Sequence, residues 1–409
     1  MRRVAVTGLG AVSALGVGVA PFWERVVAGA SGVRRISNFD ATGFLAQVAA
    51  EVPGYDPARH FSDAEQDILD RFAQFALIAA GEACAQAGLT LDDAERDRAG
   101  VTIGSGMGGV VTQDQRYQKL YGEGVWRVHP FTIPRIMNNA ATSQISMRHG
   151  LRGPSLSIGT ACAASAHAIG EAAEMIRAGR ADVMIAGGAE APIAPGVVRG
   201  WESMRVLAPA PAGDPSRACR PFSRDRLGMV LGEGAGIVVL EAWDRATARG
   251  TTILAEIAGY AATADAGHIT QPGVHSPARA ITLALAQAGM APADIDYVNA
   301  HGTATRLNDA TETTVIKQAF GADAARLAIS STKAVHGHAM GASAALECIA
   351  TILAVRHGVA PPTANYTEPD PECDLDYVPN TARPMKIRAA ISNSFAFGGL
   401  NAVLAIKKV

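Results

Sequence analysis

The sequence predicts an α/β fold, with strands and helices alternating along a chain of 409 residues. Short apolar runs bounded by glycine recur from one end to the other, and several of the segments between them carry the apolar spacing of helices. Strands that alternate with helices favour largely parallel sheets with helices on their faces. Hydrophobic residues make up 48% of the chain and charged residues 18%, which fills one large core or two smaller ones.

The strand-like runs can be placed in order along the chain. They are Val4 to Thr7, Gly100 to Gly104, Val183 to Gly187, Gly236 to Leu240, Tyr297 to Ala300, Ala328 to Ser331 and Ala389 to Ser392. Helical patterns lie between several of them, as at Asp70 to Gly88 and at Pro277 to Gly289. We find no long polar linker between these elements.

Two helical segments echo each other. Ala164-Ser165-Ala166 opens a run that ends at Gly179, and Ala342-Ser343-Ala344 opens a run of nearly equal length that ends at Gly358. Small residues in the first turns let a helix pack tightly while its amino end points at a site. The echo favours a plan of two similar halves, although alanine-rich helices resemble each other in any protein.

The composition argues against several classes of function. With 36 basic and 38 acidic residues and a formal net charge of -2, nothing in the total balance draws the chain to nucleic acid or to an anionic membrane. No uninterrupted apolar stretch reaches about 18 residues, so we expect no membrane span. The cysteines are scattered without a CxxC pair, which fits a reducing cytoplasm.

Cys162 is the cysteine whose surroundings suggest chemistry. A turn-prone segment, Gly159-Thr160-Ala161, precedes it, and the small-residue helix that begins at Ala164 follows it. We therefore expect its sulfur at a helix amino terminus, where free N–H groups and the helix dipole favour thiolate over thiol. A buried structural cysteine is the alternative. Cys84 and Cys348, inside helical patterns, are interpreted in that way.

Two further segments place histidines directly after strand-like runs. His301 precedes a glycine-threonine turn, and Lys333, His336 and His338 follow the next run in the same way. Sites in open α/β sheets gather at such strand ends, so one cysteine with these histidines suggests acyl transfer. The remaining histidines lack this setting and no metal-type spacing joins them, so we expect no metal site.

Two glycine patterns raise the question of a nucleotide site. They are Thr7-Gly8-Leu9-Gly10 and Gly104 to Gly109, and the second satisfies GxGxxG after a strand. A dinucleotide site also needs an acidic residue that closes a second strand about 20 residues further on. Glu123 falls near that distance but lies in a turn, Tyr121 to Gly124, so the sequence disfavours a nucleotide site.

Together these residues resemble the β-ketoacyl-acyl-carrier-protein synthases, most closely synthase II and its relatives, along essentially the whole chain. A Cys-His-His set distinguishes this family from the thiolase and starter-synthase branches of the same superfamily. The motifs that carry the resemblance are Thr160-Ala161-Cys162, Asn299 to Thr303, Ser331-Thr332-Lys333 with Gly337-His338, Val230 to Gly236, and Asn393 to Asn401.

The resemblance implies a thiolase-like fold in which two similar halves form five α-β-α-β-α layers. We place the halves at residues 1–250, with the nucleophilic cysteine, and 251–409, with the two histidines. The resemblance also implies a homodimer that needs no metal or organic cofactor, and the cysteine pattern implies that it is cytoplasmic. Its substrates would be carried on the phosphopantetheine of acyl-carrier protein.

The reaction that the resemblance implies is a decarboxylative Claisen condensation. Cys162 would take an acyl group as a thioester, and the backbone N–H groups of Cys162 and Phe397 would form the oxyanion hole. Malonyl carrier protein would then lose CO2 while His301 and His338 hydrogen-bond the thioester oxygen of the enolate. Attack on the acyl-cysteine would give 3-oxoacyl carrier protein.

The remaining roles also follow from matching motif to motif. Lys333, paired with Glu347, would orient the site electrostatically. Thr303 and Thr305 would contact the pantetheine arm. Phe397 would gate the acyl pocket, and Met107 is one candidate determinant of its depth. Arg127 and Arg205 would dock the carrier protein, because they match positions where the family is basic.

Several residues depart from the family pattern. The late loop reads Ala396 to Asn401 where Gly-Phe-Gly-Gly-Thr-Asn is common, so Ala396 and Leu400 replace a flexible glycine and a hydroxyl. Arg306 to Asp309 and His336 look like the nodulation-type branch, which handles specialised acyl chains. Asp63 to Arg71 is acidic where docking residues are usually basic, so the carrier-protein patch is reduced or its partner is unusual.

Two other functions compete with a condensing enzyme. A chain-length-factor-like subunit of a heterodimeric ketosynthase keeps the fold but characteristically lacks the cysteine, whereas Cys162, His301 and His338 are all present here. A thiolase or hydrolytic acyltransferase would need another cysteine or an acid at the position of His338. The sequence leaves open the acyl length and the pathway, whether fatty acid, polyketide, polyene or signalling-lipid synthesis.

Overall fold

The strand order of the main sheet repeats in its two halves. The computed structural model describes residues 2 to 409. In the first half the order is β6-β5-β7-β8-β1, and in the second half it is β11-β10-β14-β15-β9. Taken in sequence order, each strand of one half occupies the place of its counterpart in the other. The two halves of the plan are therefore visible in the topology.

The bounds of these strands are as follows. The first half consists of β1 (Val4–Ser13), β5 (Ala99–Gly104), β6 (Ser155–Ile158), β7 (Val183–Glu190) and β8 (Gly234–Ala242). The second half consists of β9 (Ala255–Ala264), β10 (Tyr297–Asn299), β11 (Ala328–Ser330), β14 (Ala389–Ala396) and β15 (Leu400–Lys407). A short antiparallel pairing of β1 with β9 joins the halves. The predicted division at residues 250 and 251 falls shortly before β9 and stays a prediction.

The prediction of largely parallel sheets was wrong. β5 pairs in parallel with β6 and β7, and β10 pairs in parallel with β11 and β14. However, β8 and β1 in the first half, and β15 and β9 in the second, run antiparallel to their neighbours. The turn between β14 and β15 spans only residues 397–399, and such a short connection permits antiparallel pairing alone.

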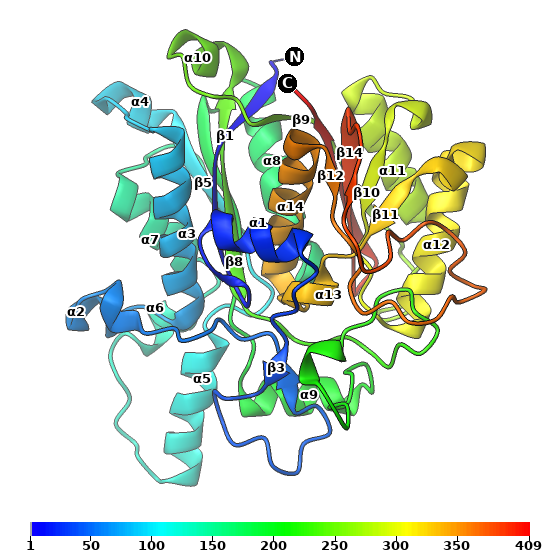
Figure 1. Cartoon of the computed structure of the whole chain (residues 1–409). Helices are drawn as coiled ribbons and strands as arrows, with labels where there is room; N and C mark the ends of the chain where they lie inside the picture. Colours follow the sequence, from blue (N-terminus) through cyan, green and yellow to red (C-terminus); the bar gives the residue numbers. More distant parts are fainter. Residues whose placement is uncertain (1) are drawn as a thin grey trace.

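Helices form three layers around the two halves of the sheet (Figure 1). On one outer side, α3 (Arg71–Ala87) packs on β1 and β8, and on the other α11 (His275–Ala288) packs on β9 and β15. Between the halves lie α8 (Ala164–Arg177), against β5 and β7, and α14 (Ser343–His357), against β8 and β14. This arrangement gives the five α-β-α-β-α layers.

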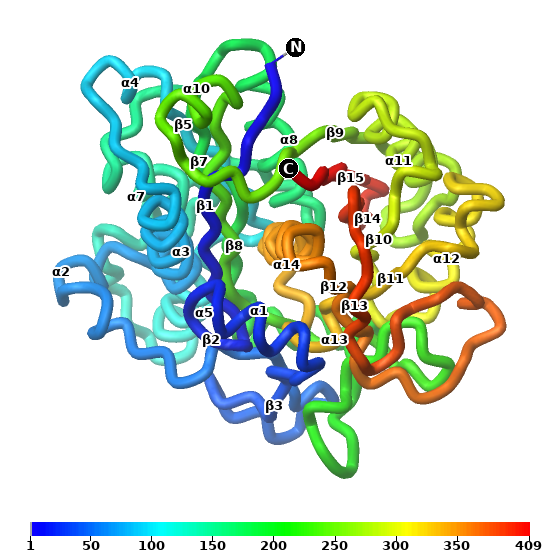
Figure 2. Tube along the Cα trace, turned by 45° about the horizontal axis from the view of Figure 1, so that its top comes forward, coloured from blue at the N-terminus to red at the C-terminus, as the bar shows by residue number. Residues whose placement is uncertain are grey.

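The central helix α14 is nearly uniform in its burial. All its residues from Ser343 to Val355 are buried, as expected of a helix that is apolar on every side. Figure 2 shows it close to end-on, with β1 and β8 on one side and β14 and β15 on the other. The echo between two alanine-rich runs thus corresponds to the two helices of the middle layer.

Close packing accounts for the two glycine patterns. A Cβ at Gly8 or Gly10 would come within about 2 Å of a carbonyl oxygen of α3. A Cβ at Gly104 would lie 2.4 Å from the backbone nitrogen of Ser165 in α8. These glycines let helices approach the strands closely, so both glycine patterns have a structural role. Glu123 is exposed directly after a helical turn and does not close a strand. A nucleotide site therefore has no support.

The remaining elements are shorter or connect the layers. They are β2 (Gly16–Val17), α1 (Val19–Val27), β3 (Arg34–Arg35), β4 (Val48–Ala49), η1 (Pro57–Arg59), α2 (Asp63–Gln66), α4 (Asp93–Asp97), α5 (Val110–Tyr117), η2 (Gln118–Gly122), α6 (Thr132–Ile136), α7 (Ala140–His149), η3 (Ala161–Ala163), α9 (Pro195–Ser203), η4 (Pro215–Arg217), α10 (Trp243–Ala248), η5 (Pro292–Asp294), α12 (Arg306–Phe320), η6 (Gly321–Arg326), α13 (Lys333–His336), η7 (Met340–Ala342), β12 (Val359–Ala360) and β13 (Arg383–Pro384). Within residues 2–409, no helix has the length and apolar character needed to cross a membrane.

Candidate active site

Cys162 lies in a short 3-10 turn, η3, that leads directly into α8. The residue before it, Ala161, has a φ of 48°, a left-handed conformation that few residues other than glycine adopt. This turn presents the thiol at the amino end of the helix, as the sequence predicts. Strain of this kind in an alanine is typical of functional sites, where surrounding structure holds it in place.

Burial opposes the predicted preference of this position for the thiolate, which stays a prediction. Burial raises the pKa of the Cys162 thiol to about 11, and the charge of Glu190 also raises it. The ammonium of Lys333 and the backbone N–H groups of Cys162 and Phe397 act in the opposite direction, but they do not outweigh burial. The balance of these effects favours the thiol, which then loses its proton as it reacts.

His301 and His338 face the thiol from the second half of the fold. One nitrogen of each ring and the Cys162 sulfur all lie within 4.8 Å of one another. The ring centroids of the two histidines are 5.5 Å apart and their planes are nearly perpendicular, at 86°. Burial, followed by the charge of Lys333, lowers the pKa of both rings well below the usual value. Both imidazoles are therefore neutral.

Lys333 determines which nitrogen of His301 carries the proton. Its ammonium donates to Glu347, to the carbonyl oxygen of His301 at 2.7 Å, and to Nδ1 of His301 at 3.3 Å. An ammonium has donors only, so Nδ1 must accept and the proton of this neutral ring resides on Nε2. Glu347 is buried on α14, and its contact with Lys333 is the expected ion pair.

A carboxylate on α12 anchors the loop that carries His301. Glu312 accepts from the backbone nitrogens of His301 and Gly302, each at 2.8 Å, and from the amide of Asn393 at 3.2 Å. Burial raises the pKa of Glu312 to about 7. Glu312 is not among the residues predicted from the sequence. Its only signal is its place in the helix that follows the His301 turn.

His338 is held by a strand-like contact and by a hydroxyl. Its backbone nitrogen donates to the carbonyl of Val230 at 2.7 Å, and its carbonyl accepts from Gly232 at 2.9 Å. The motif from Val230 to Gly236 thus supports the second histidine. Nδ1 of His338 lies 2.8 Å from Oγ of Ser343 at the start of α14. Ser343 was not singled out from the sequence.

The neighbouring His336 belongs to the scaffold of the site. Its Nδ1 lies 2.9 Å from the carbonyl of Gly337 and its Nε2 lies 3.0 Å from the hydroxyl of Thr332. A neutral ring that donates from Nδ1 and accepts at Nε2 satisfies both contacts. Burial lowers the pKa of His336 to about 3, so it stays neutral.

The spacing of Cys162, His301 and His338 would also suit a metal ion. The tautomer of His301 opposes one, because Nε2 keeps its proton while Lys333 occupies Nδ1. A metal needs a free lone pair on the nitrogen that it binds. The arrangement instead provides a hydrogen-bond donor beside a nucleophile.

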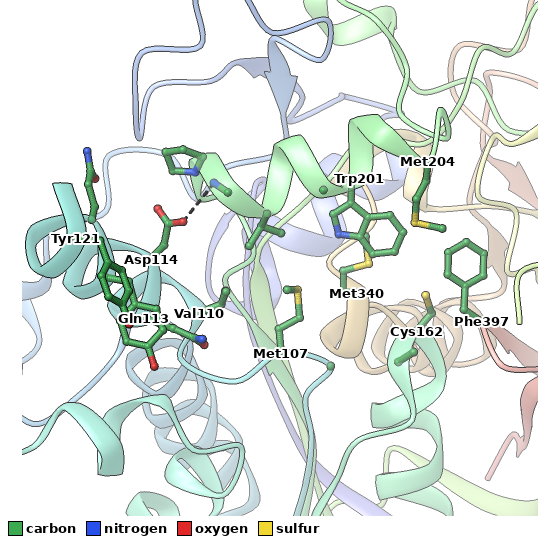
Figure 3. Close-up of a pocket in the computed structure, with 18 residues that line it drawn as sticks. Met107, Val110, Gln113, Asp114, Tyr121, Cys162, Trp201, Met204, Met340 and Phe397 are labelled. Atoms are coloured by element: carbon green, nitrogen blue, oxygen red, sulfur yellow. Dashed lines mark hydrogen bonds between the residues drawn. The ribbon is translucent and has the colours of Figure 1, made fainter.

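Cys162 lines two cavities. The larger, which we call the α5–α9 cavity, has a volume of about 840 Å³ and is mostly apolar. It runs from Cys162 past Met107 and Val110 to Tyr121 (Figure 3). The smaller, the histidine-side cavity, has a volume of about 500 Å³ and contains His301, His338, Thr303 and Thr305. Two channels of different character therefore reach one thiol.

Phe397 lines both cavities, together with Trp201. Their rings stack with centroids 5.8 Å apart. Gly398 and Gly399, which follow, have φ values of 82° and 68° that other residues rarely adopt. Ala396, by contrast, is the last residue of β14 and stays in extended backbone, so the loss of a glycine there causes no strain.

The docking residues predicted from the sequence, Arg127 and Arg205, are both exposed. Within residues 2–409 neither forms an ion pair, so both guanidinium groups are available to a partner. Arg71, in the acidic segment, pairs with Glu233 at 2.6 Å, so its guanidinium group is not available to a partner. Thr303 and Thr305 lie 2.9 Å apart through their hydroxyls, on the wall of the histidine-side cavity.

Two family models match the chain. The model described as "Beta-ketoacyl synthase, N-terminal domain" matches residues 1–246, and that described as "Beta-ketoacyl synthase, C-terminal domain" matches residues 254–367. Nodulation protein E of Rhizobium meliloti (strain 1021) is 48% identical over 409 residues, which cover 100% of both chains. The 3-oxoacyl-[acyl-carrier-protein] synthase 2 of Coxiella burnetii is 44% identical over 410 residues, covering 100% of this chain and 99% of that protein.

Solved structures match over the full length as well. The ishigamide ketosynthase/chain length factor structure has a TM-score of 0.92 and 38% identity, and covers 100% of this chain and 99% of the other. A type II polyketide synthase acyl-carrier protein in complex with its ketosynthase bound to the hexaketide has a TM-score of 0.92 and 34% identity, with 100% of both chains covered. Both the sequence and the fold therefore have close relatives.

Proposed function

Because the chain belongs to the β-ketoacyl synthase family of condensing enzymes, we propose that it joins an acyl group held on Cys162 to a malonyl unit. Both groups would arrive on acyl-carrier protein. The observation that carries the proposal is that Cys162 lines two cavities, with two neutral histidines beside the thiol. The α5–α9 cavity is suited to an apolar acyl chain, and the histidine-side cavity is suited to the malonyl group and the arm that carries it.

In the first half-reaction the thiol of Cys162 attacks the acyl thioester. The backbone N–H groups of Cys162 and Phe397 would stabilise the oxyanion, since both already favour negative charge at this sulfur. The carbon–sulfur bond of the donor breaks, and the departing carrier thiolate takes the proton that Cys162 releases. The acyl chain then occupies the α5–α9 cavity.

In the second half-reaction malonyl carrier protein loses CO2 and leaves an enolate. The Nε2 proton of His301 would donate to the thioester oxygen as it gains charge. His338 would do the same, with the hydroxyl of Ser343 donating to its Nδ1. The carbanion attacks the acyl carbon, the bond to Cys162 breaks, and the sulfur regains a proton from solvent. The products are 3-oxoacyl carrier protein and CO2.

Thr303 and Thr305 are suited to the pantetheine arm, because their hydroxyls line the histidine-side cavity. Arg127 and Arg205 would meet the acidic surface of the carrier protein. No metal or organic cofactor enters any step. The cysteines carry free thiols, in keeping with the cytoplasmic location that we propose.

We also propose that the enzyme is a homodimer. Ten exposed large hydrophobic residues fall between residues 117 and 156 of the sequence, and exposed apolar side chains in such number support a protein–protein interface. In the same region β6 ends the sheet order with exposed side chains, so its outer edge is open to pairing. A second copy would cover both features.

Incubation with a ladder of acyl-carrier proteins, followed by malonyl carrier protein, tests the proposal. We expect intact-mass spectrometry to show an acyl group on Cys162 and then a product longer by two carbons. The Cys162→Ala variant should fold normally and take no acyl group. Condensation by that variant would contradict the mechanism. Acylation only in the presence of another subunit would favour a heterodimer with a chain-length-factor-like subunit.

A further inference from the structure

Glu190 is a buried carboxylate that the steps above do not use. It is the last residue of β7 and is fully buried. One oxygen accepts from the hydroxyl of Ser105 at 3.0 Å and from the backbone nitrogen of Met107 at 3.1 Å. The other accepts from the backbone nitrogens of Gly106 at 2.5 Å and Gly341 at 3.0 Å. Four donors thus converge on one side chain.

Three of these donors come from the first half of the fold and one comes from the second. The loop at residues 105–107 follows β5 in the first half, whereas Gly341 lies in η7 in the second. η7 is the counterpart of η3, because each leads into a helix of the middle layer. Met340 has a φ of 43°, close to the 48° of Ala161, so Gly341 occupies the position that Cys162 has in the first half.

The two glycines leave room for this carboxylate. A Cβ at Gly106 would lie 3.1 Å from Oε2 of Glu190, and a Cβ at Gly341 would lie 2.7 Å from the same atom. A Cβ at Gly341 would also lie 2.5 Å from the backbone nitrogen of Gly106. The loop and η7 therefore approach each other closely, and Glu190 is an acceptor that the two share.

These contacts lead to the wall of the α5–α9 cavity. Met107 donates its backbone nitrogen to Glu190, and Met340 is the neighbour of Gly341. Both methionines line the cavity beside Cys162 (Figure 3). We propose that Glu190 is a positioning residue that ties the two halves together and so fixes these methionines, which makes it a determinant of the acyl chain that Cys162 accepts.

The charge of Glu190 supports a link to the thiol. Burial raises the pKa of Glu190 to about 7, while its four hydrogen bonds favour the ionised form. Its charge in turn raises the pKa of Cys162, after the larger effect of burial. The other ionisable groups around the thiol are Lys333, paired with Glu347, and the neutral imidazoles of His301 and His338.

The experiment compares Glu190→Gln with the wild-type enzyme. A glutamine keeps one acceptor, so in either orientation its NH2 group faces at least one backbone donor and part of the connection is lost. We expect the ratio of Cys162 acylation rates for long and short acyl-carrier proteins to change about threefold to tenfold, the effect of losing one or two hydrogen bonds. We also expect iodoacetamide to label Cys162 at lower pH, because a negative charge has been removed.

Glu241→Gln is the matched control. Glu241 is equally buried but bonds to Thr7, Arg245 and Arg249, none of which lines either cavity. We expect it to lower the melting temperature while both the chain-length ratio and the labelling profile stay unchanged. Glu190→Ala, which removes all four contacts, should shift the ratio further if it folds.

This inference rests on the proposed function, and the two can fail separately. If wild-type Cys162 takes no acyl group from any carrier protein, the proposed function fails. If the wild type is acylated but Glu190→Gln keeps the same chain-length ratio and labelling profile, the positioning role is overturned, whatever happens to the melting temperature.

Discussion

The ammonium of Lys333 lies 3.3 Å from Nδ1 of His301 and 2.7 Å from its carbonyl oxygen. Burial, together with this contact, keeps the ring neutral, and the contact places the ring's proton on Nε2. The same ammonium balances Glu347. One buried cation therefore links the charge balance of the site to the donor that an enolate needs.

Replacement of Lys333 by methionine should slow decarboxylation by more than the accompanying loss of stability explains. The His301 proton is then free to move to Nδ1, and we expect malonyl decarboxylation to fall about a hundredfold. The single variant also leaves Glu347 buried without its partner, which costs about 3–5 kcal/mol. Carbon dioxide release and chemical unfolding measure the two effects.

The double variant Lys333→Met/Glu347→Gln separates these effects. It removes the uncompensated charge, so we expect much of the stability to return while decarboxylation stays low. Recovery of both together would show that Lys333 acts on stability alone.

The rate at which iodoacetamide labels Cys162 should rise steadily with pH. Because burial raises the pKa of this thiol to about 11, the thiolate fraction increases about tenfold for each pH unit up to pH 9. Peptide mass spectrometry distinguishes Cys162 from the other cysteines, and its alanine variant gives the background. A plateau below pH 8 would mean that the helix amino end outweighs burial, as the sequence alone suggests.

Glu312→Gln should misplace His301 without removing it. The carboxylate accepts from two backbone nitrogens of the His301 loop, and an amide retains only one acceptor. We expect condensation to fall about tenfold while acylation of Cys162 changes little, since the thiol lies in the other half. Burst kinetics with acyl-carrier protein distinguish the two steps. Equal loss of both would indicate general unfolding of the site.

The residues after strand ends were predictable, and the family resemblance implied the pair of Lys333 and Glu347, but other supporting groups were not predicted. Cys162, His301 and His338 stand in local patterns of strand, turn and small-residue helix. Glu312 and Glu190 act through contacts that link distant segments, and no local pattern shows which backbone nitrogens a buried carboxylate will meet. The strand order follows from pairing between residues far apart in the sequence, so antiparallel neighbours were missed for the same reason.

Met107→Trp should shorten the acyl chain that the enzyme accepts. Met107 lies between Cys162 and the far end of the α5–α9 cavity (Figure 3). Each buried methylene contributes about 0.8 kcal/mol, or roughly a fourfold gain in acylation, until the chain meets an obstacle. We expect the gain to stop at a shorter length in the variant. Acylation rates over a ladder of chain lengths measure it, and an unchanged profile would place the acyl chain elsewhere.

Leu156→Glu should dissociate the dimer. Leu156 is 46% exposed on β6, the open edge of the sheet, and a buried unpaired charge there would oppose association. Leu45→Glu is the control, because Leu45 is 75% exposed outside the apolar region at residues 117–156. Sedimentation velocity should show a monomer for the first variant and a dimer for the wild type and the control. Since Tyr117 and Tyr121 line the far end of the α5–α9 cavity within that region, a monomer should also lose preference for long acyl chains. A dimeric Leu156→Glu protein would exclude β6 from the interface.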